Sequence, residues 1–373
     1  MVVERPSGYK YFEILKNHLD GDLNKIFNNK LIYPRQIEIH LPADHKRTCN
    51  FHCPHCQGRI VKKPLYPFEQ KALNLMRKLS GKIPFYIFGG NYTEPLLNPY
   101  FMSFLSLSKQ CKAHFGIHTN GSLLNLLEEK QGWLTELHRI AENKQDYLSL
   151  SLDAGLLSSH KKVKGIKVNY FDDIIKAMRK IAKIRGNSNK LGLRVCYLLT
   201  DDNSSKEEIE NIINIMKDIG VDSLRFSIPY DLYGKQFTEV EKYRKNVEVE
   251  KDKKFKDFFN EYTTSPDSKT HIFYFSPFNQ DIHRMNFKQC IYCYYQITLG
   301  SDGNIYRCSS TATPSFPANI LGKMTDDLDE FNQLILKNYN PNWNPQTCFN
   351  VGARCNRMAL EINKSWEKIC DEK

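Results

Sequence analysis

The sequence of 373 residues contains no long hydrophobic run, and no stretch approaches the ~18 consecutive apolar residues of a transmembrane helix. The N-terminus, MVVERPSGYKYFEILKNHLDGD, has scattered charges and lacks the apolar segment and small-residue cleavage site of a signal peptide. There is also no internal repeat, low-complexity tract, arginine-rich arm or RNA-binding signature. These absences predict a cytoplasmic protein whose expected partners are neither membranes nor nucleic acids.

The composition is that of a globular chain with a basic surface. Hydrophobic residues make up 41%, enough for the core of one large domain and a small one. Lys and Arg number 53 against 42 for Asp and Glu, a formal net charge of +11. The lysines are interleaved with acids, which is typical of solvated helix faces. The excess could also attract an acidic substrate, a nucleotide or a reducing partner with an acidic face.

Eleven cysteines are too many for disulfides in a reducing compartment, so metal ligation or chemistry is the expected use. They are grouped: three lie at 49–56, five lie between 290 and 355, and Cys111, Cys196 and Cys370 stand alone. The grouping predicts two separate cysteine sites.

Between residues 36 and 230, short apolar segments alternate with amphipathic ones, the pattern of a parallel α/β sheet. The predicted strands are 36–43, 83–90, 115–121, 146–154, 191–199 and 223–230. The predicted helices include 67–80, 122–143, 170–186 and 206–220, each with apolar residues near i, i+3, i+4 and i+7. The expected organisation is an N-terminal extension (1–35), an α/β domain (36–235), a connector of helix and loop (236–285) and a cysteine-bearing C-terminal domain (286–373).

The segment CNFHCPHC places Cys49, Cys53 and Cys56 directly after the first predicted strand, at the edge where parallel α/β sheets carry their chemistry. Thiolates select zinc or iron–sulfur clusters. A structural zinc site would need a fourth ligand, which His52 or His55 could supply. The alternative is a four-iron cluster in which three irons bind cysteine and the fourth stays open.

The CxxxCxxC spacing after the first strand of a βα-repeat chain resembles the radical S-adenosylmethionine (radical SAM) family. The resemblance implies an α/β fold of partial (β/α)6 TIM-like barrel type. It also implies a [4Fe-4S] cluster on the three cysteines, with S-adenosylmethionine chelating the open iron. Reductive cleavage of that cofactor then gives a 5′-deoxyadenosyl radical.

Further segments at the strand ends resemble the same family. Gly89 and Gly90, followed after three residues by Glu94, resemble its Gly-Gly-Glu-Pro motif, from which the insertion departs. Thr119 and Asn120 resemble its Thr-Asn-Gly turn. These matches imply that the glycines, Glu94 and the Thr-Asn pair contact the cofactor.

Two more strands carry polar side chains with period-two spacing. The segment Ser149–Asp153 resembles the Ser-x-Asp-Ala strand of the family, and alternation places Ser149, Ser151 and Asp153 on one face. In the next strand Arg194 and Cys196 share a face in the same way. Ser151, Asp153 and Arg194 are therefore cofactor-binding candidates. Cys196 is a candidate hydrogen donor, but the composition of the strand favours the alternative, a small buried hydrophobe.

The C-terminal cysteines surround a predicted β-hairpin, ITLG-SDGN-IYRC, and resemble the SPASM and twitch extensions of radical SAM enzymes. Five cysteines suit one auxiliary [4Fe-4S] cluster, for which Cys290, Cys308, Cys348 and Cys355 are the preferred ligands. Cys293 is a rival, and a zinc site with four cysteine ligands is the alternative.

The resemblance implies an electron donor such as flavodoxin or ferredoxin, but it does not define the substrate. Only some 35 residues precede the first strand, fewer than a peptide-binding winged-helix domain needs. This favours a small polar metabolite, such as a sugar, aminocyclitol or nucleoside-linked intermediate of natural-product biosynthesis, undergoing dehydrogenation, epimerisation or decarboxylation. A peptide maturase that uses a separate leader-binding protein is the alternative, and a zinc-stabilised binding module is the non-enzyme hypothesis.

Overall fold

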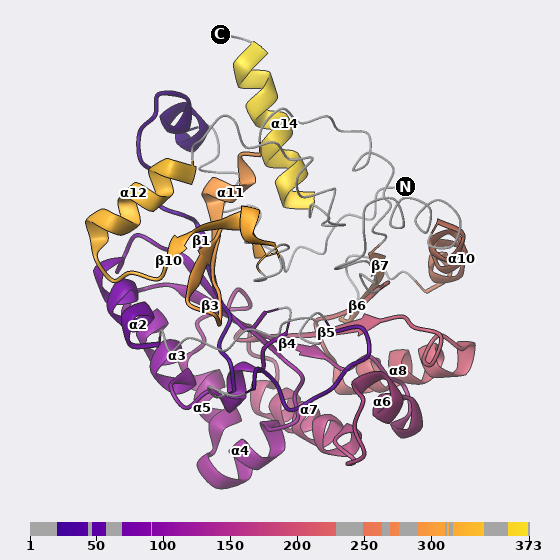
Figure 1. The fold of residues 1–373 in the computed structure, drawn as a ribbon. Coiled ribbons are helices and arrows are strands. Elements are labelled where there is room, and N and C mark those ends of the chain that lie inside the picture. The colour runs from indigo at the N-terminus through magenta and orange to yellow at the C-terminus, as the bar shows by residue number, and fades with distance from the viewer. Residues whose placement is uncertain are drawn as a thin grey trace.

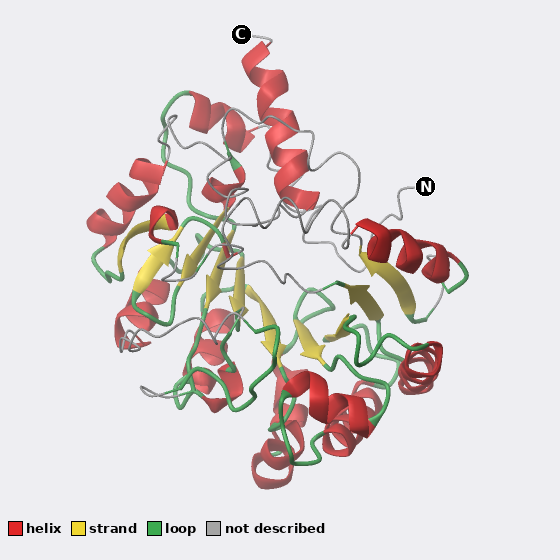
Figure 2. Cartoon of the chain, turned by 45° about the vertical axis from the view of Figure 1, so that its right-hand side comes forward, coloured by secondary structure: helices red, strands yellow, loops and turns green. Residues whose placement is uncertain are grey.

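The computed structural model describes residues 21–43, 47–56, 69–90, 92–228, 249–262, 269–275, 290–309, 312, 316–338 and 357–371. The fold is mixed α/β and is built on one sheet of ten described strands in the order β10-β9-β8-β1-β2-β3-β4-β5-β6-β7. The sheet is curved, and the helices that connect its parallel strands lie along the outer, convex side (Figures 1 and 2). None of the described helices is long and apolar enough to span a bilayer.

The central strands are parallel and follow one another along the chain. They are β1 (Gln36–Ile39), β2 (Phe85–Phe88), β3 (His114–Thr119), β4 (Tyr147–Ser151), β5 (Gly192–Leu198), β6 (Ser223–Ser227) and β7 (His271–Phe275). The first six confirm the predicted strands, and each is shorter than predicted; β1 and β2 have half of the predicted length. Because all seven run in the same direction, the loops that follow them meet at one edge of the sheet.

The connecting helices cover the convex face and explain where the core lies. They are α2 (Glu69–Lys78), α3 (Phe101–Gln110), α4 (Leu124–Gln131), α5 (Trp133–Ile140), α6 (Leu157–Lys164), α7 (Phe171–Arg185), α8 (Lys206–Ile219) and α10 (Val249–Asn260). Helix α8 shows the local signals that begin and end a helix. Ser205 accepts a hydrogen bond from the Glu208 amide at its start, and Gly220 ends it with a φ of +75°.

The segment 122–143 was predicted as one helix, but it forms two. Gly132 adopts a φ of +62° between α4 and α5, which glycine does without the Cβ penalty of other residues. The hydrophobic pattern continues across the break, so the spacing of apolar residues did not reveal that the segment forms two helices.

The C-terminal region extends the sheet at the opposite edge from β7. The predicted hairpin is confirmed as β8 (Gln296–Leu299) and β9 (Asn304–Tyr306), joined through Ser301–Gly303, and β10 (Ile320–Lys323) pairs with β9. Strand β8 lies parallel to β1. The hairpin of the predicted C-terminal domain therefore continues the sheet of the α/β domain.

Several elements were missed at the sequence level. The connector 236–285, expected to contain helix and loop, also contains strand β7. The C-terminal region, where helical periodicity looked weak, contains α12 (Leu328–Asn338) and α14 (Arg357–Asp371), besides the short α11 (Tyr292–Tyr295). The charged helix expected within 239–259 is confirmed where it is described, as α10.

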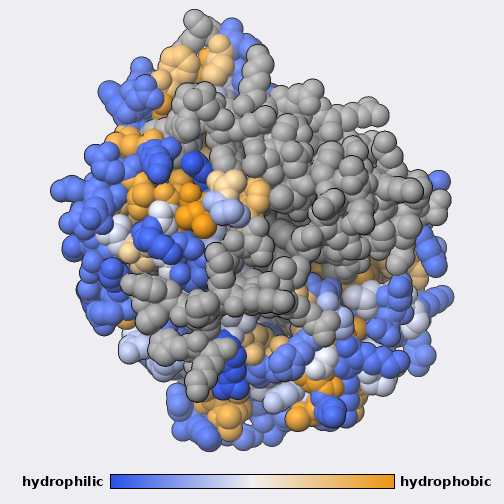
Figure 3. Space-filling view, viewed as in Figure 1, coloured by the Kyte–Doolittle hydropathy of each residue, from blue (hydrophilic) through white to orange (hydrophobic). Residues whose placement is uncertain are grey.

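The two faces of the sheet differ in polarity. On β5, Leu193, Val195 and Tyr197 are buried under the outer helices, whereas Arg194 and Cys196 are half-buried on the inner, concave face. Hydrophilic residues predominate over the outer helices along the left and lower margins of Figure 3. The accessible polar side chains of the sheet thus lie inside its curve, as the alternation predicted.

Candidate active site

The three-cysteine loop follows β1 and packs against the C-terminal end of α6. The amide of His52 donates to the carbonyl oxygen of Lys164 at 3.1 Å. Gly165 has a φ of +62°, and a Cβ added there would lie 2.2 Å from the carbonyl oxygen of His52. The close approach of loop and helix therefore requires glycine at this position.

Cys49, Cys53 and Cys56 are half-buried; the charge of Cys53 affects Cys49, and the charge of Cys56 affects Cys53. Within the described residues, no three His, Cys, Asp or Glu side chains are grouped closely enough to enclose a metal ion. Burial, with the nearby Glu94 carboxylate, raises the pKa of Cys49 to about 12, and burial also raises the pKa of Cys53. Both shifts favour the protonated thiols of Cys49 and Cys53, so binding of a metal there would release protons.

The surroundings of Cys49 fit a thiolate ligand. Its sulfur accepts from the amide of Phe51 at 3.4 Å and from Asn120 Nδ2 at 3.5 Å. Such N–H···S contacts stabilise a thiolate, and the thiolates of cysteine are the ligands that iron–sulfur clusters use. The donor set and its supporting hydrogen bonds thus fit an iron–sulfur cluster held by the loop.

Glu94 joins the cysteine loop to the end of β3. Its Oε1 accepts from Thr119 Oγ1 at 2.6 Å, and its Oε2 accepts from the amide of Asn120 at 2.7 Å. Its own amide donates to the carbonyl oxygen of Thr48 at 3.0 Å. Three motifs that are separate in the sequence therefore meet at one edge of the sheet, as their positions after parallel strands predicted.

A hydrogen bond across the insertion brings its ends together before Glu94. The amide of Thr93 donates to the carbonyl oxygen of Gly90 at 3.3 Å. Burial raises the pKa of Glu94 to about 7, although hydrogen bonds from Thr119 and from the backbone oppose the shift.

Gly89 and Gly90 lie where no side chain would fit. A Cβ on Gly89, whose φ is +109°, would lie 2.3 Å from the carbonyl oxygen of His118, and one on Gly90 would overlap the ring of His40. Contacts within the chain therefore require glycine at both positions.

Asp153 is fully buried and accepts several hydrogen bonds at the end of β4. Its Oδ1 accepts from the amide of Leu198 at 2.7 Å, while its Oδ2 accepts from Ser151 Oγ at 2.9 Å and from Lys164 Nζ at 2.5 Å. Burial alone would raise the pKa of Asp153, but Lys164 holds it below its usual value. Both carboxylate oxygens are thus engaged within the protein.

Lys164 was missed at the sequence level. Its side chain is 2% exposed, and its charge affects Cys53 and Cys49 as well as Asp153. Burial would lower the pKa of Lys164, but Asp153 raises it. A permanent positive charge therefore lies beside the cysteine loop, held there by Asp153.

Polar side chains also lie on the inner face of the sheet, farther from the cysteine loop. Ser149 Oγ lies 3.6 Å from Cys196 Sγ, and the guanidinium of Arg194 lies 3.7 Å from the centre of the Tyr147 ring. His118 Nε2 is 2.9 Å from the Tyr147 hydroxyl. Gly116 makes room for that ring, because an added Cβ would lie 2.4 Å from it.

Cys290, Cys293 and Cys308 lie near one another. Cys293 Sγ donates to the carbonyl oxygen of Cys290 at 2.9 Å, and Cys290 Sγ lies 3.9 Å from the side-chain amide of Asn363 on α14. Cys293 lowers the pKa of Cys290, while burial raises the pKa of Cys293, which Cys308 also affects. The predicted ligands Cys348 and Cys355 lie outside the described residues.

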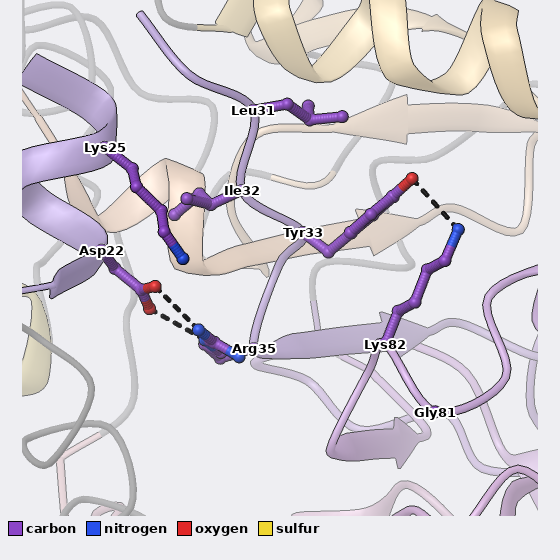
Figure 4. Close-up of a pocket in the computed structure, with 8 residues that line it drawn as sticks. All are labelled: Asp22, Lys25, Leu31, Ile32, Tyr33, Arg35, Gly81 and Lys82. Carbon is purple, nitrogen blue, oxygen red and sulfur yellow. Dashed lines mark hydrogen bonds and ion pairs between the residues drawn. The ribbon is translucent and has the colours of Figure 1, made fainter. Parts of the chain in front are cut away.

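A cavity of about 260 Å³ lies away from these groups. It is lined by residues that precede β1 and β2, and it contains the Asp22–Arg35 ion pair and the Lys82–Tyr33 hydrogen bond (Figure 4). It therefore opens at the N-terminal ends of the strands, whereas functional groups in parallel α/β sheets gather at the C-terminal ends. We place the active site at the cysteine loop.

The fold and the site define a parallel α/β protein with a three-cysteine loop at the C-terminal edge of its sheet. Residues 44–200 match the family model of the radical SAM superfamily. The matched region includes the cysteine loop and strands β2 to β5 and ends before β6. No curated protein matches the sequence.

Several solved structures share the fold. SuiB of Streptococcus suis bound to S-adenosylmethionine has a TM-score of 0.53 at 14% identity, over 80% of this chain and 66% of SuiB. The chain thus spans slightly less than two thirds of that protein. SuiB bound to the precursor peptide SuiA has a TM-score of 0.51 at 14% identity, over 80% of this chain and 64% of SuiB. The structure of anSMEcpe with bound AdoMet has a TM-score of 0.50 at 16% identity, over 90% of this chain and 96% of that protein.

Proposed function

We propose that the protein is a radical SAM enzyme that cleaves S-adenosylmethionine reductively and abstracts hydrogen from its substrate. The observation that carries this proposal is the convergence of Cys49, Glu94 and Asn120 through direct hydrogen bonds and electrostatic contact. When bound, a [4Fe-4S] cluster with one open iron would supply the electron that generates the 5′-deoxyadenosyl radical from the cofactor.

In this proposal the chain's own residues hold and orient the cofactor. Cys49, Cys53 and Cys56 hold the cluster, and Asn120 donates to Cys49. Glu94 fixes Asn120 and offers a carboxylate near the cofactor ammonium. The polar side chains of Ser151 and Arg194 on the inner face extend the cofactor surface, while Asp153 keeps Lys164 beside the loop.

We also propose that the curved sheet is a partial (β/α)6 barrel of radical SAM type, followed by a twitch-like auxiliary domain with a second [4Fe-4S] cluster. The proximity of Cys290, Cys293 and Cys308 supports a thiolate site in that domain. Cys290, Cys308, Cys348 and Cys355 are the preferred ligands in this proposal, and Cys293 is a rival.

For the substrate we retain a small polar metabolite that undergoes dehydrogenation, epimerisation or decarboxylation. Cys196 lies on the inner face, where a thiol could return a hydrogen atom to a substrate radical. Flavodoxin or ferredoxin would supply the electron. A peptide substrate is the second candidate, favoured by the shared fold of SuiB bound to its precursor peptide.

Anaerobic reconstitution with iron and sulfide, followed by dithionite and S-adenosylmethionine, tests the proposal. We expect 5′-deoxyadenosine from the wild type and none from Cys49→Ala/Cys53→Ala/Cys56→Ala. Cys370→Ala, at an exposed position on α14, is the matched control and should behave as the wild type. Bound zinc without deoxyadenosine formation would contradict the enzyme function and support a zinc-stabilised binding module.

A further inference from the structure

The C-terminal end of helix α6 lies against the cysteine loop. The amide of His52, the residue directly before Cys53, donates to the carbonyl oxygen of Lys164 at 3.1 Å. Gly165, which ends the helix, packs so closely against His52 that an added Cβ would lie 2.2 Å from its carbonyl oxygen. The backbone of Lys164 is therefore in direct contact with the loop segment between Cys49 and Cys53.

The side chain of Lys164 is fixed within the protein. Its ammonium nitrogen lies 2.5 Å from Asp153 Oδ2 and 3.2 Å from Ser151 Oγ, both at the C-terminal end of β4. The side chain of Lys164 is 2% exposed and that of Asp153 is 0% exposed, so water and salt screen this pair little. Burial and two oxygen acceptors thus keep the positive charge at one place beside the loop.

The lysine affects the cysteine loop more strongly than its carboxylate partner does. Burial is the largest influence on the pKa of Cys53 and raises it. Among the charged groups, Lys164 has the largest effect and lowers that pKa, whereas Asp153 has a smaller effect and raises it. The charge of Lys164 also acts on Cys49 and on Glu94. The ion pair therefore does not act on the loop as a neutral unit, because its positive end dominates there.

We propose that the Lys164 ammonium raises the reduction potential of the [4Fe-4S] cluster bound to the three-cysteine loop, and that Asp153 limits this increase. The inference rests on the proposed function and names a residue that controls its electron-transfer step. Reduction brings one electron from the donor protein and adds one negative charge at the loop, without breaking a bond. A fixed positive charge stabilises the added negative charge, most strongly where little water screens it.

The test is a redox titration of the reconstituted full-length protein, followed by electron paramagnetic resonance without S-adenosylmethionine. The signal that is absent from the triple alanine variant of the cysteine loop identifies the cluster to be followed. Lys164→Met removes the positive charge and preserves most of the side-chain volume, while Asp153→Asn removes the negative charge. Lys162→Met is the matched control, because Lys162 lies on the same helix but is exposed to solvent.

Lys164→Met should lower the potential, so that the equilibrium constant for reduction falls about tenfold, which corresponds to about 59 mV for one electron. Asp153→Asn should raise the potential, and Lys164→Arg and Lys162→Met should titrate close to the wild type. Opposite shifts distinguish a charge effect from disruption of the site, since entry of water would move both variants in the same direction. The double variant Lys164→Met/Asp153→Asn should titrate at a lower potential than Asp153→Asn, which measures the effect of the lysine even if Lys164→Met alone does not fold.

Shifts of both single variants in the same direction would overturn the inference. So would an unchanged potential in Lys164→Met, an equal shift in Lys162→Met, or equal potentials of the double variant and Asp153→Asn. Iron content and deoxyadenosine formation of the wild type are measured separately. Opposite shifts without deoxyadenosine would contradict the proposed enzyme function but support the role of Lys164. Deoxyadenosine formation with unshifted potentials would overturn the role of Lys164 alone, and zinc in place of iron would overturn both.

Discussion

The buried ion pair between Lys164 and Asp153 gives the sharpest test of how the site is built. The side chains are 2% and 0% exposed, and Lys164 Nζ also lies 3.2 Å from Ser151 Oγ. Lys164→Met preserves most of the volume of the side chain but leaves the Asp153 carboxylate buried without its charge partner. Breaking a buried pair in this way costs about 3–5 kcal/mol, a large part of the ~5–15 kcal/mol that stabilises a typical domain.

The assay is a double-mutant cycle measured by urea unfolding of the apoprotein in reducing buffer. Lys164→Met and Asp153→Asn should each lower the free energy of unfolding by several kcal/mol, and the double variant should be less destabilised than the sum by at least about 2 kcal/mol. The exposed pair Lys176–Glu129, whose side chains are 65% and 54% exposed, is the matched control. Lys176→Met should cost less than about 1 kcal/mol.

The pH dependence of this cost follows from the two pKa shifts. The pKa of Asp153 is lowered by Lys164 against the effect of burial, so its contribution is present above the unfolded value and is lost as pH falls through the folded one. The pKa of Lys164 is raised by Asp153, so its contribution is lost only as pH rises through the folded value. The cost of Lys164→Met should therefore be constant from about pH 5 to 9. A cost below about 1 kcal/mol, or additive single effects, would refute the buried pair.

Further variants test other parts of the fold and site. The pKa of Glu94 is raised to about 7. The free energy of unfolding of the wild type should therefore fall as pH rises from about 4.5 to 7, because the carboxyl ionises in the unfolded chain but not in the folded one. Glu94→Gln removes this titration and should therefore gain roughly 3 kcal/mol relative to the wild type between pH 5 and pH 8 in chemical unfolding, whereas a difference that does not change with pH would contradict the burial of the charge. Gly116→Ala should lower thermal stability because its Cβ would lie 2.4 Å from the Tyr147 ring, and a neutral effect would show that the ring moves freely. Ser205→Ala should cost about 0.5–2 kcal/mol by loss of the bond from the Glu208 amide, and a loss smaller than that in urea unfolding would argue against the cap.

Local sequence signals predicted most of the sheet and the position of the site. Six strands and the hairpin at Ser301–Gly303 were found because their signals, period-two alternation and a turn glycine, lie within a few residues. The convergence of the cysteine loop, Glu94 and Asn120 was also predictable, since parallel strands bring the loops that follow them to one edge. The hydrogen bonds of Glu94 to Thr119 and Asn120 could not be predicted, because three residues separate Glu94 from the glycine pair and the sequence does not show how the chain folds there.

The burial of Lys164, which was missed, depends on long-range packing. Lys164 lies in the segment HKKVKG, and nothing in that run distinguishes the buried lysine from the exposed ones. Strand β7 was missed because its five residues, HIFYF, follow a charged helix and pair with a distant strand.

The most direct test of the central claim is electron paramagnetic resonance of the dithionite-reduced, reconstituted protein before and after S-adenosylmethionine is added. If Cys49, Cys53 and Cys56 hold a cluster with one open iron, the signal should change when the cofactor binds. In the triple alanine variant that change should disappear, as iron falls from about eight to about four atoms per chain. A signal that does not respond to S-adenosylmethionine in the wild type, or zinc in place of iron, would contradict the account.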